Sequence, residues 1–100
     1  MTDDKIKYLI ASSENLIILF FSHDGCQPCK TFKPILNDAV DEFNGNVSLV
    51  SIDVTESNLG NEYGVRSVPT TILIKDGGVL EIRTTTMSAH DTKALIREYA

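Results

Sequence analysis

The stretch LIILFFSHDGCQPCKTFKP, residues 16–34, carries an apolar run directly into the only two cysteines of the chain, Cys26 and Cys29. A short continuous apolar run bounded by turn residues predicts a strand buried on both faces, here over residues 15–22, and therefore central in a sheet covered by helices. Apolar residues at helical spacing follow the cysteines, and Pro34 within that pattern predicts a kinked helix. The cysteines are thus expected between the end of a central strand and the start of a helix.

The remaining sequence predicts further helices and strands in alternation. The expected elements, in chain order, are a helix over residues 3–13 capped by Thr2, a second buried strand over 47–54, one or two helical turns within 55–65, two strands over 70–85 and a helix over 88–100. The motif KDGG between the last two strands is typical of a β-hairpin, so these strands should be antiparallel. Helices between the earlier strands imply right-handed parallel crossovers. We therefore expect a central mixed sheet with helices on both faces.

Composition indicates a single globular domain over residues 1–100, with 42% hydrophobic and 23% charged residues. The net charge of −5 argues against a nucleic-acid partner, because phosphates are met by clustered Lys and Arg. The first residues, MTDDKIKYLI, carry two acids where a secretory signal has basic residues, and the longest apolar run has six residues. We therefore expect no export, no membrane span and a cytoplasmic, monomeric protein.

Three kinds of chemistry use a Cys-x-x-Cys pair. A zinc site needs a second Cys or His pair at ligand spacing, whereas this chain has only His23 and His90, far apart, so we expect no metal. A structural disulfide that closes so small a loop removes little entropy from the unfolded chain. Redox exchange fits the position best, since closely spaced cysteines in a reducing cytosol are more often catalytic or metal-bound than permanently bridged.

The position at a helix N-terminus assigns different roles to the two thiols. Cys26 would lie where unpaired backbone N–H groups and the helix dipole stabilise a thiolate, so its pKa should fall below the free value of about 8.5. We expect Cys26 to be the exposed nucleophile and Cys29, one turn further in, to be the shielded thiol that resolves a mixed disulfide. Pro28 stiffens the first turn and Gln27 adds no charge, which favours a reductant over an oxidant.

Several separated motifs resemble the thioredoxin family over nearly the whole chain: CQPCK, Pro34, SIDV, YGVRSVPT and KDGG, in that order. The resemblance implies a thioredoxin-like α/β fold and a thiol–disulfide oxidoreductase that reduces protein disulfides through Cys26 and Cys29. It implies no bound cofactor besides the redox-active disulfide, and electrons would come from a thioredoxin reductase-like donor. The supporting active-site residues that it implies are Gly25, Gln27, Pro28, Lys30 and Pro69.

The resemblance also implies a substrate-binding surface. Pro69 corresponds to the family's cis-proline, which faces the two sulfurs, although most X-Pro bonds are trans. The backbone of Val68 is left free to pair with an extended substrate peptide. The surface implied in this way consists of Val68, Pro69, Thr70 and Thr85.

Four departures from the family pattern accompany these matches. Gly25 stands where thioredoxins usually have Trp, and the chain contains no Trp at all. Phe20 and Leu49 replace the family's buried Asp and its Lys partner, a paired loss that avoids an uncompensated buried charge. Thr85 replaces a Gly of the binding surface, so the reductase partner need not be the standard one. The short N-terminus leaves hardly any room for the family's first strand, and we expect a four-stranded sheet.

Two other functions stay open at this point. A glutaredoxin-like, glutathione-dependent oxidoreductase is the first, although glutaredoxins usually place Pro first in the motif. A non-catalytic thioredoxin-fold binding module is the second. The missing Trp and buried Asp favour that module, whereas the two cysteines and the Val-Pro-Thr segment favour chemistry. We expect the loop residues His23 and Asp24 to be solvated rather than to tune the thiolate.

Overall fold

Each expected helix and strand forms in the computed structural model, which describes residues 1–100. The elements, in chain order, are α1 (Asp3–Ser12), β1 (Leu16–Ser22), α2 (Gln27–Asp41), β2 (Val47–Asp53), α3 (Leu59–Glu62), β3 (Thr70–Lys75), β4 (Gly78–Arg83) and α4 (Ala89–Tyr99). The caps predicted at Thr2 and Ser88 are present, because each side chain accepts a hydrogen bond from a backbone N–H three residues on. None of the helices combines the length and apolarity needed to cross a membrane.

β1 is the organising strand of a four-stranded sheet with the order β2-β1-β3-β4. It pairs in parallel with β2 and antiparallel with β3, and β3 pairs antiparallel with β4. No strand precedes α1, so the mixed four-stranded sheet expected from the sequence is confirmed.

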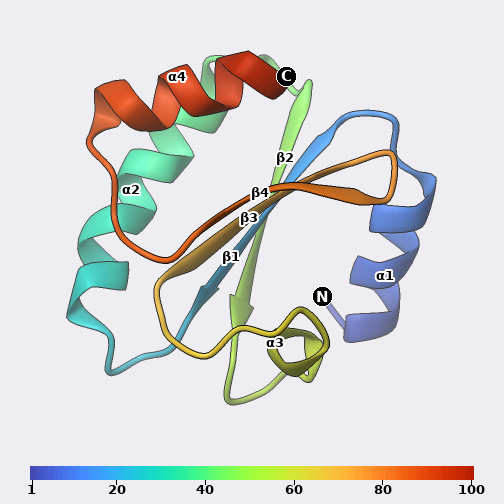
Figure 1. Ribbon diagram of the computed structural model, residues 1–100, viewed down its shortest axis with the longest axis vertical. Helices are drawn as coiled ribbons and strands as arrows, with labels where there is room; N and C mark the ends of the chain where they lie inside the picture. Colours follow the sequence, from blue (N-terminus) through green and yellow to red (C-terminus); the bar gives the residue numbers. More distant parts are fainter.

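The direction of β3 differs from the expectation of parallel crossovers between the earlier strands. β3 lies on the opposite side of β1 from β2 and runs antiparallel to β1. The reason is the length of α3, which has only four residues. A parallel crossover usually returns along the sheet in a helix about as long as a strand of about 20 Å, whereas one turn of helix rises only about 6 Å. β3 therefore starts at the end of the sheet where β2 finishes (Figure 1).

Helices cover both faces of β1, as the continuous apolar run predicts. α2 and α4 lie on one face of the sheet, and α1 and α3 lie on the other (Figure 1). Alternate side chains of β1 divide between these layers. Ile17, Leu19 and Phe21 pack in a cluster with residues of α1 and α3, whereas Ile18 packs with α2 and α4. Packing against β1 therefore positions the helices on both faces of the sheet.

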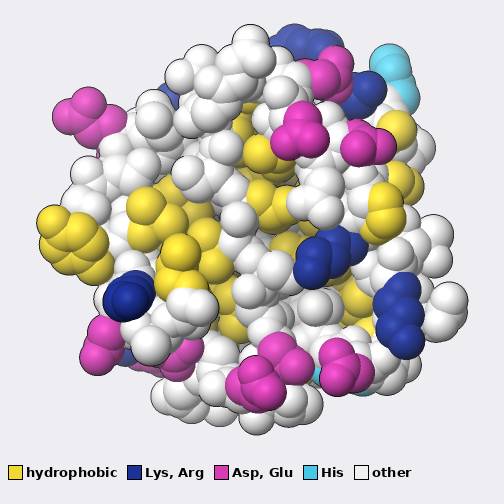
Figure 2. All heavy atoms as spheres, turned by 180° about the vertical axis from the view of Figure 1, so that it is seen from behind, with side chains coloured by type: hydrophobic (Ala, Val, Ile, Leu, Met, Phe, Trp, Pro, Cys, Tyr) yellow, Lys and Arg dark blue, Asp and Glu magenta, His cyan; other side chains and the backbone are white.

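β2 is not buried on both faces, contrary to the expectation for residues 47–54. It is an edge strand, in which Leu49 is half-buried and Ser51 is exposed. The view of the molecule from behind shows hydrophobic side chains near the middle of this side, with charged side chains around them (Figure 2). An apolar run alone could not distinguish a central strand from this edge, since the neighbour that covers a strand is set by the sheet order.

The predicted hairpin joins β3 and β4 through a two-residue turn. Asp76 and Gly77 both have positive φ angles, 53° and 80°, as a type I′ turn requires. β4 forms the second edge of the sheet, and its Val79, Leu80 and Ile82 are exposed.

A carboxylate at the start of α1 ties that helix to the segment before α3. Asp3 Oδ1 accepts a hydrogen bond from Ser57 Oγ at 2.7 Å, and its Oδ2 accepts one from the Asn58 N–H at 2.9 Å. These bonds, the one from Ser57 first, hold the pKa of Asp3 below its usual value of 3.8. A carboxyl group whose pKa is lowered in the folded state stabilises that state above the unfolded pKa.

Asp3→Asn should therefore lower the free energy of unfolding at pH 7, and the difference from wild type should shrink as the pH falls below about 4. Asp4→Asn is the matched control, since Asp4 lies in the same first turn but its side chain makes no hydrogen bond. Denaturant unfolding at several pH values measures both. Equal effects of the two substitutions at pH 7 would show that only the helix dipole is involved.

Candidate active site

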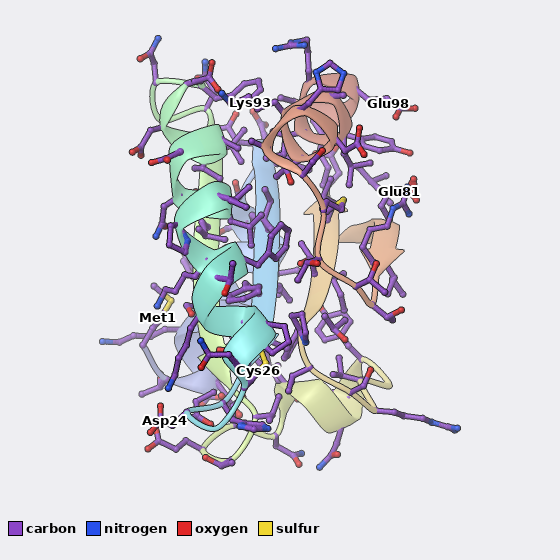
Figure 3. All side chains as sticks on the ribbon, turned by 90° about the vertical axis from the view of Figure 1, so that its left-hand side faces the viewer. Met1, Asp24, Cys26, Glu81, Lys93 and Glu98 are labelled. Atoms are coloured by element: carbon purple, nitrogen blue, oxygen red, sulfur yellow. A yellow bond between two sulfur atoms is a disulfide. The ribbon has the colours of Figure 1, made fainter.

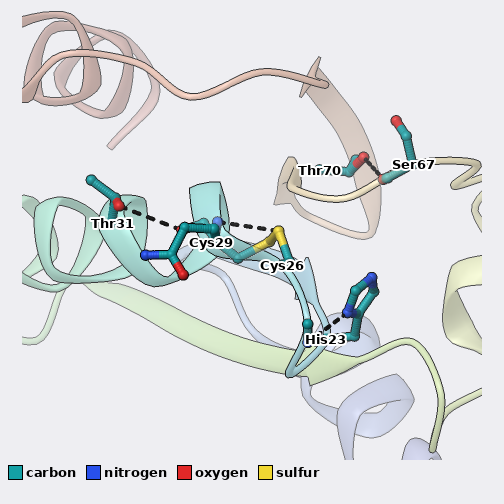
Figure 4. Close-up of a disulfide and its surroundings, with 8 residues drawn as sticks. His23, Cys26, Cys29, Thr31, Ser67 and Thr70 are labelled. Atoms are coloured by element: carbon teal, nitrogen blue, oxygen red, sulfur yellow. Dashed lines mark hydrogen bonds between the residues drawn. A yellow bond between two sulfur atoms is a disulfide. The ribbon is translucent and has the colours of Figure 1, made fainter.

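The two cysteines form a disulfide at the N-terminus of α2. Their Cα atoms are 5.3 Å apart and their sulfurs are bonded. Cys26 is the residue that caps α2, and its Sγ accepts a hydrogen bond from the Cys29 N–H at 3.2 Å (Figure 4). Viewed from the α2 side, Cys26 lies at one end of the helix with Asp24 in the loop beyond it (Figure 3). The position predicted from the sequence is thus confirmed.

Both cysteines are buried in this disulfide form, with 6% of Cys26 and 3% of Cys29 exposed. Our expectation that Cys26 is an exposed residue is therefore wrong for this form. The reason is packing, because both side chains turn inward against Phe20, Phe32 and Leu36. Cys29 is slightly less exposed than Cys26 in this form.

The buried cluster that contains the disulfide has no acidic member. Phe20 is fully buried and meets Phe32 edge to face, with ring centroids 6.0 Å apart. Leu49 packs against the same cluster from β2. The two positions that hold a charged pair in the family pattern thus both hold hydrocarbon, as expected from their joint replacement.

The Val68–Pro69 bond is cis, as the resemblance implies. Neither the N–H nor the C=O of Val68 makes a hydrogen bond within the chain, and the residue is half-buried. Thr70 holds this loop in place, because its hydroxyl donates to the Ser67 carbonyl at 2.6 Å (Figure 4). Thr70 itself is only 3% exposed, so its side chain serves the loop and presents little surface to a partner.

His23 is fixed in the loop before the cysteines instead of being freely solvated. Its Nδ1 accepts a hydrogen bond from the Gly25 N–H at 3.0 Å, and its carbonyl accepts one from the Cys26 N–H at 3.1 Å. The half-buried ring lines a hollow of about 340 Å³ together with Ser67 and Val68 of the cis-proline loop. Sequence reasoning missed this contact because the loop that meets His23 is distant in the chain.

A second hollow, of about 380 Å³, lies on the other side of the motif. It is lined by Gln27 and Pro28 of the motif and by Thr86 and Met87 of the segment before α4, among others. Thr85, the residue expected on the binding surface, lines a different depression next to α4. No sequence pattern predicted that Thr86 and Met87 line this hollow, because only the tertiary fold brings their segment beside α2.

A third hollow, of about 390 Å³, reaches Cys29 and Phe20 from the side of β2. Its rim is polar and includes Lys30, which is exposed, and Asp53. Hydrogen bonds from the Thr55 hydroxyl and N–H keep the pKa of Asp53 below its usual value, and His23 adds a smaller effect. Nowhere does the structure gather three His, Cys, Asp or Glu side chains that could hold a metal ion.

Comparison with known proteins gives a consistent result. A model of the thioredoxin family matches residues 1–99. Thioredoxin-T of Drosophila melanogaster is 36% identical over 81 residues, which cover 80% of this chain and 52% of that protein. The chain thus spans about half the length of that relative. Thioredoxin of Rickettsia felis is 33% identical over 78 residues, which cover 77% of this chain and 74% of that protein.

A solved structure is also similar. A mutant thioredoxin from Halobacterium salinarum NRC-1 superposes with a TM-score of 0.87 at 26% sequence identity. The superposition covers 99% of this chain and 86% of the other. The similarity therefore extends over every element described above.

Phe20→Asp should lower the free energy of unfolding of the disulfide form by about 3–5 kcal/mol, because an unpaired carboxyl would replace a buried ring. Adding Leu49→Lys should restore part of that loss, since it supplies an opposite charge on the adjacent strand. Denaturant unfolding of the two single variants and the double variant measures the coupling. Strictly additive losses would show that the two positions do not form a pair in this protein.

Proposed function

The chain belongs to the thioredoxin family of thiol–disulfide oxidoreductases, and on that premise we propose that it reduces disulfides of other proteins through Cys26 and Cys29. The observation that carries the proposal is the position of the Cys26–Cys29 disulfide at a helix N-terminus, together with a cis-proline loop whose Val68 backbone is unpaired. The redox-active disulfide is itself the reactive group, so no further cofactor is required for the exchange.

Cys26 is the nucleophile in this proposal. Its thiolate attacks one sulfur of a substrate disulfide, which forms a bond between Cys26 and the substrate and releases the other substrate sulfur as a thiolate. Cys29 then loses its proton and attacks the Cys26 sulfur. The Cys26–Cys29 disulfide forms, the second substrate sulfur leaves and takes up a proton, and the two electrons of the dithiol have passed to the substrate.

The first turn of α2 supports this assignment of the nucleophile. The Cys29 N–H already donates to the Cys26 Sγ, and the same donor would stabilise a thiolate on that atom. The positive end of the helix dipole acts on the same sulfur. Gln27 carries no charge and Pro28 has no N–H, so Gln27 adds no positive charge beside the sulfur and Pro28 adds no backbone donor.

Substrate binding is proposed at the cis-proline loop. An extended peptide can pair with the free N–H and C=O of Val68, in the manner of a strand added to an exposed edge. The hollows on either side of the motif, one at Ser67 and one at Met87, would take side chains of that peptide. Thr85 lies two residues before Met87 and would contribute to the outer part of this surface.

Repeated turnover needs a reductant for the disulfide, and we propose a thioredoxin reductase-like donor. Gly25 and Thr85 change the surface that such a donor would meet, so a reductase adapted to this surface is expected. We further propose that the chain acts as a single domain and a monomer in the cytoplasm, since a disulfide reductase works where the surroundings keep it reduced.

Reduction of insulin with dithiothreitol as electron source tests the activity without assuming a particular reductase. Cys26→Ser should abolish catalysis, whereas Cys29→Ser should accumulate a mixed disulfide with insulin because the resolving thiol is missing. In the reduced wild type, iodoacetamide at neutral pH should label Cys26 first, as mapped by mass spectrometry. Faster labelling of Cys29, or trapping by Cys26→Ser instead, would reverse the two roles. No acceleration by the wild type would favour a non-catalytic binding module.

The reduction potential of the disulfide should lie nearer to about −270 mV than to the roughly −120 mV of strongly oxidising relatives. The reason is that Gln27 and Pro28 add no positive charge beside Cys26, while every member of the fold shares the helix dipole. Equilibration against dithiothreitol or glutathione buffers of defined potential measures it. A midpoint reduction potential of about −150 mV would contradict the reductase function and indicate an oxidase or isomerase.

A further inference from the structure

One buried side-chain oxygen has no hydrogen-bond partner in this disulfide form, the hydroxyl of Thr71. Thr71 is 1% exposed, so bulk water does not satisfy it. The two other buried threonines are both paired, Thr70 with the Ser67 carbonyl and Thr92 with the Ser88 carbonyl. An unpaired buried hydroxyl destabilises the state in which it occurs, and such a group in a native protein calls for an explanation.

The register of the sheet places Thr71 in the layer beneath the disulfide. Thr71 on β3 is directly opposite Phe20 on β1, and opposed residues of an antiparallel pair share a face. The next pair on that face, Leu73 and Ile18, packs under α2 and α4. Phe20 in turn belongs to the buried cluster that contains both cysteines. The hydroxyl therefore lies beside the residue on which the disulfide rests, two positions after the cis-proline.

The chemistry of this layer offers few partners for a hydroxyl. The cluster under the first turns of α2 consists of hydrocarbon and the two cysteines, and the polar residues that reach it line the hollow on the β2 side, across β1 from Thr71. In the disulfide form the two sulfurs are bonded to each other, and the Cys26 Sγ already accepts the Cys29 N–H. Reduction separates the sulfurs and gives Cys29 a thiol, a weak acceptor that is no longer bonded to Cys26, and loss of its proton gives a thiolate, which is a far stronger hydrogen-bond acceptor.

We propose that the Thr71 hydroxyl donates a hydrogen bond to the sulfur of Cys29 once the disulfide is opened, and so acts as a positioning residue for the resolving thiol. The hydroxyl would supply a polar group beside Phe20, the residue that stands where the family pattern has a buried carboxylate. The inference rests on the proposed function, because it concerns the resolving step of that reaction.

The step itself is the second half of the exchange. Cys29 releases its proton to solvent through the polar hollow that reaches it, and the resulting thiolate attacks the Cys26 sulfur of the mixed disulfide. The Cys26–Cys29 bond forms, the bond between Cys26 and the substrate breaks, and the substrate thiolate takes up a proton. The Thr71 hydroxyl loses no proton in this sequence, since it only stabilises the Cys29 thiolate before attack.

Thr71→Val removes the hydroxyl while it keeps the shape of the side chain. It should stabilise the disulfide form, in which the hydroxyl is unpaired, and destabilise the dithiol form, in which a bond is lost. The equilibrium with dithiothreitol should shift about tenfold toward the disulfide, which corresponds to a potential about 30 mV more negative. Release of 5-thio-2-nitrobenzoate from its mixed disulfide with Cys26 should slow about tenfold, while the initial attack by Cys26 keeps its rate.

Two further variants serve as controls. Thr71→Ser keeps a hydroxyl and should restore the wild-type potential and release rate. Thr92→Val removes a buried hydroxyl that is already paired in α4, so it should weaken both redox forms equally and leave the potential unchanged.

An equal change in the stability of the two forms of Thr71→Val, with unchanged potential and release rate, would overturn the inference. The hydroxyl would then stay unpaired in both redox states. These measurements need only the Cys26–Cys29 disulfide and a small-molecule thiol. A failure of insulin reduction with an intact shift of potential would therefore count against the proposed function and not against the role of Thr71.

Discussion

Burial of β1 on both faces is the constraint from which the rest of the structure follows. Six of its seven residues are buried, and each large apolar side chain removed from water contributes roughly 1.5–3 kcal/mol. A strand of this kind is stable only with a partner strand along each edge and helices over each face. α2 is one of those helices, and the chain must turn at the end of β1 to enter it. Cys26 ends that turn and Cys29 lies in the first turn of α2, so the site is placed by the same burial that forms the core.

The absence of charge among the residues beneath the disulfide is the second constraint on the site. Phe20 and Leu49 replace a charged pair by hydrocarbon, which avoids the cost of keeping ions out of water. The consequence is a site with very few polar groups that can assist the second cysteine. A polar hollow still reaches Cys29 from the β2 side, and the Thr71 hydroxyl lies beside Phe20. The hollow is the proposed route for the proton of Cys29, and the hydroxyl is the proposed donor to its thiolate.

Sequence patterns correctly predicted the features that depend on residues close together in the chain. The caps, the turn at Asp76 and the helix start at Cys26 depend on residues within a few positions, and all three are as predicted. Predictions failed where a distant segment decides the outcome. The exposure of β2 depends on its place in the sheet order, and the direction of β3 depends on how far a short α3 can carry the chain. The burial of Cys26 depends on a packed layer assembled from three elements.

The amino-acid sequence by itself determined the element order, the central role of β1, the place of Cys26 and Cys29 at a helix N-terminus, and the family to which the chain is similar. Side-chain period, capping and turn preferences are local properties, and a linear pattern records them completely. Only the tertiary structure decided which groups meet the disulfide. The fixed ring of His23, the hollow beside Met87 and the unpaired hydroxyl of Thr71 arise because strand register and helix packing bring residues far apart in the chain into one layer, and no local pattern encodes that proximity.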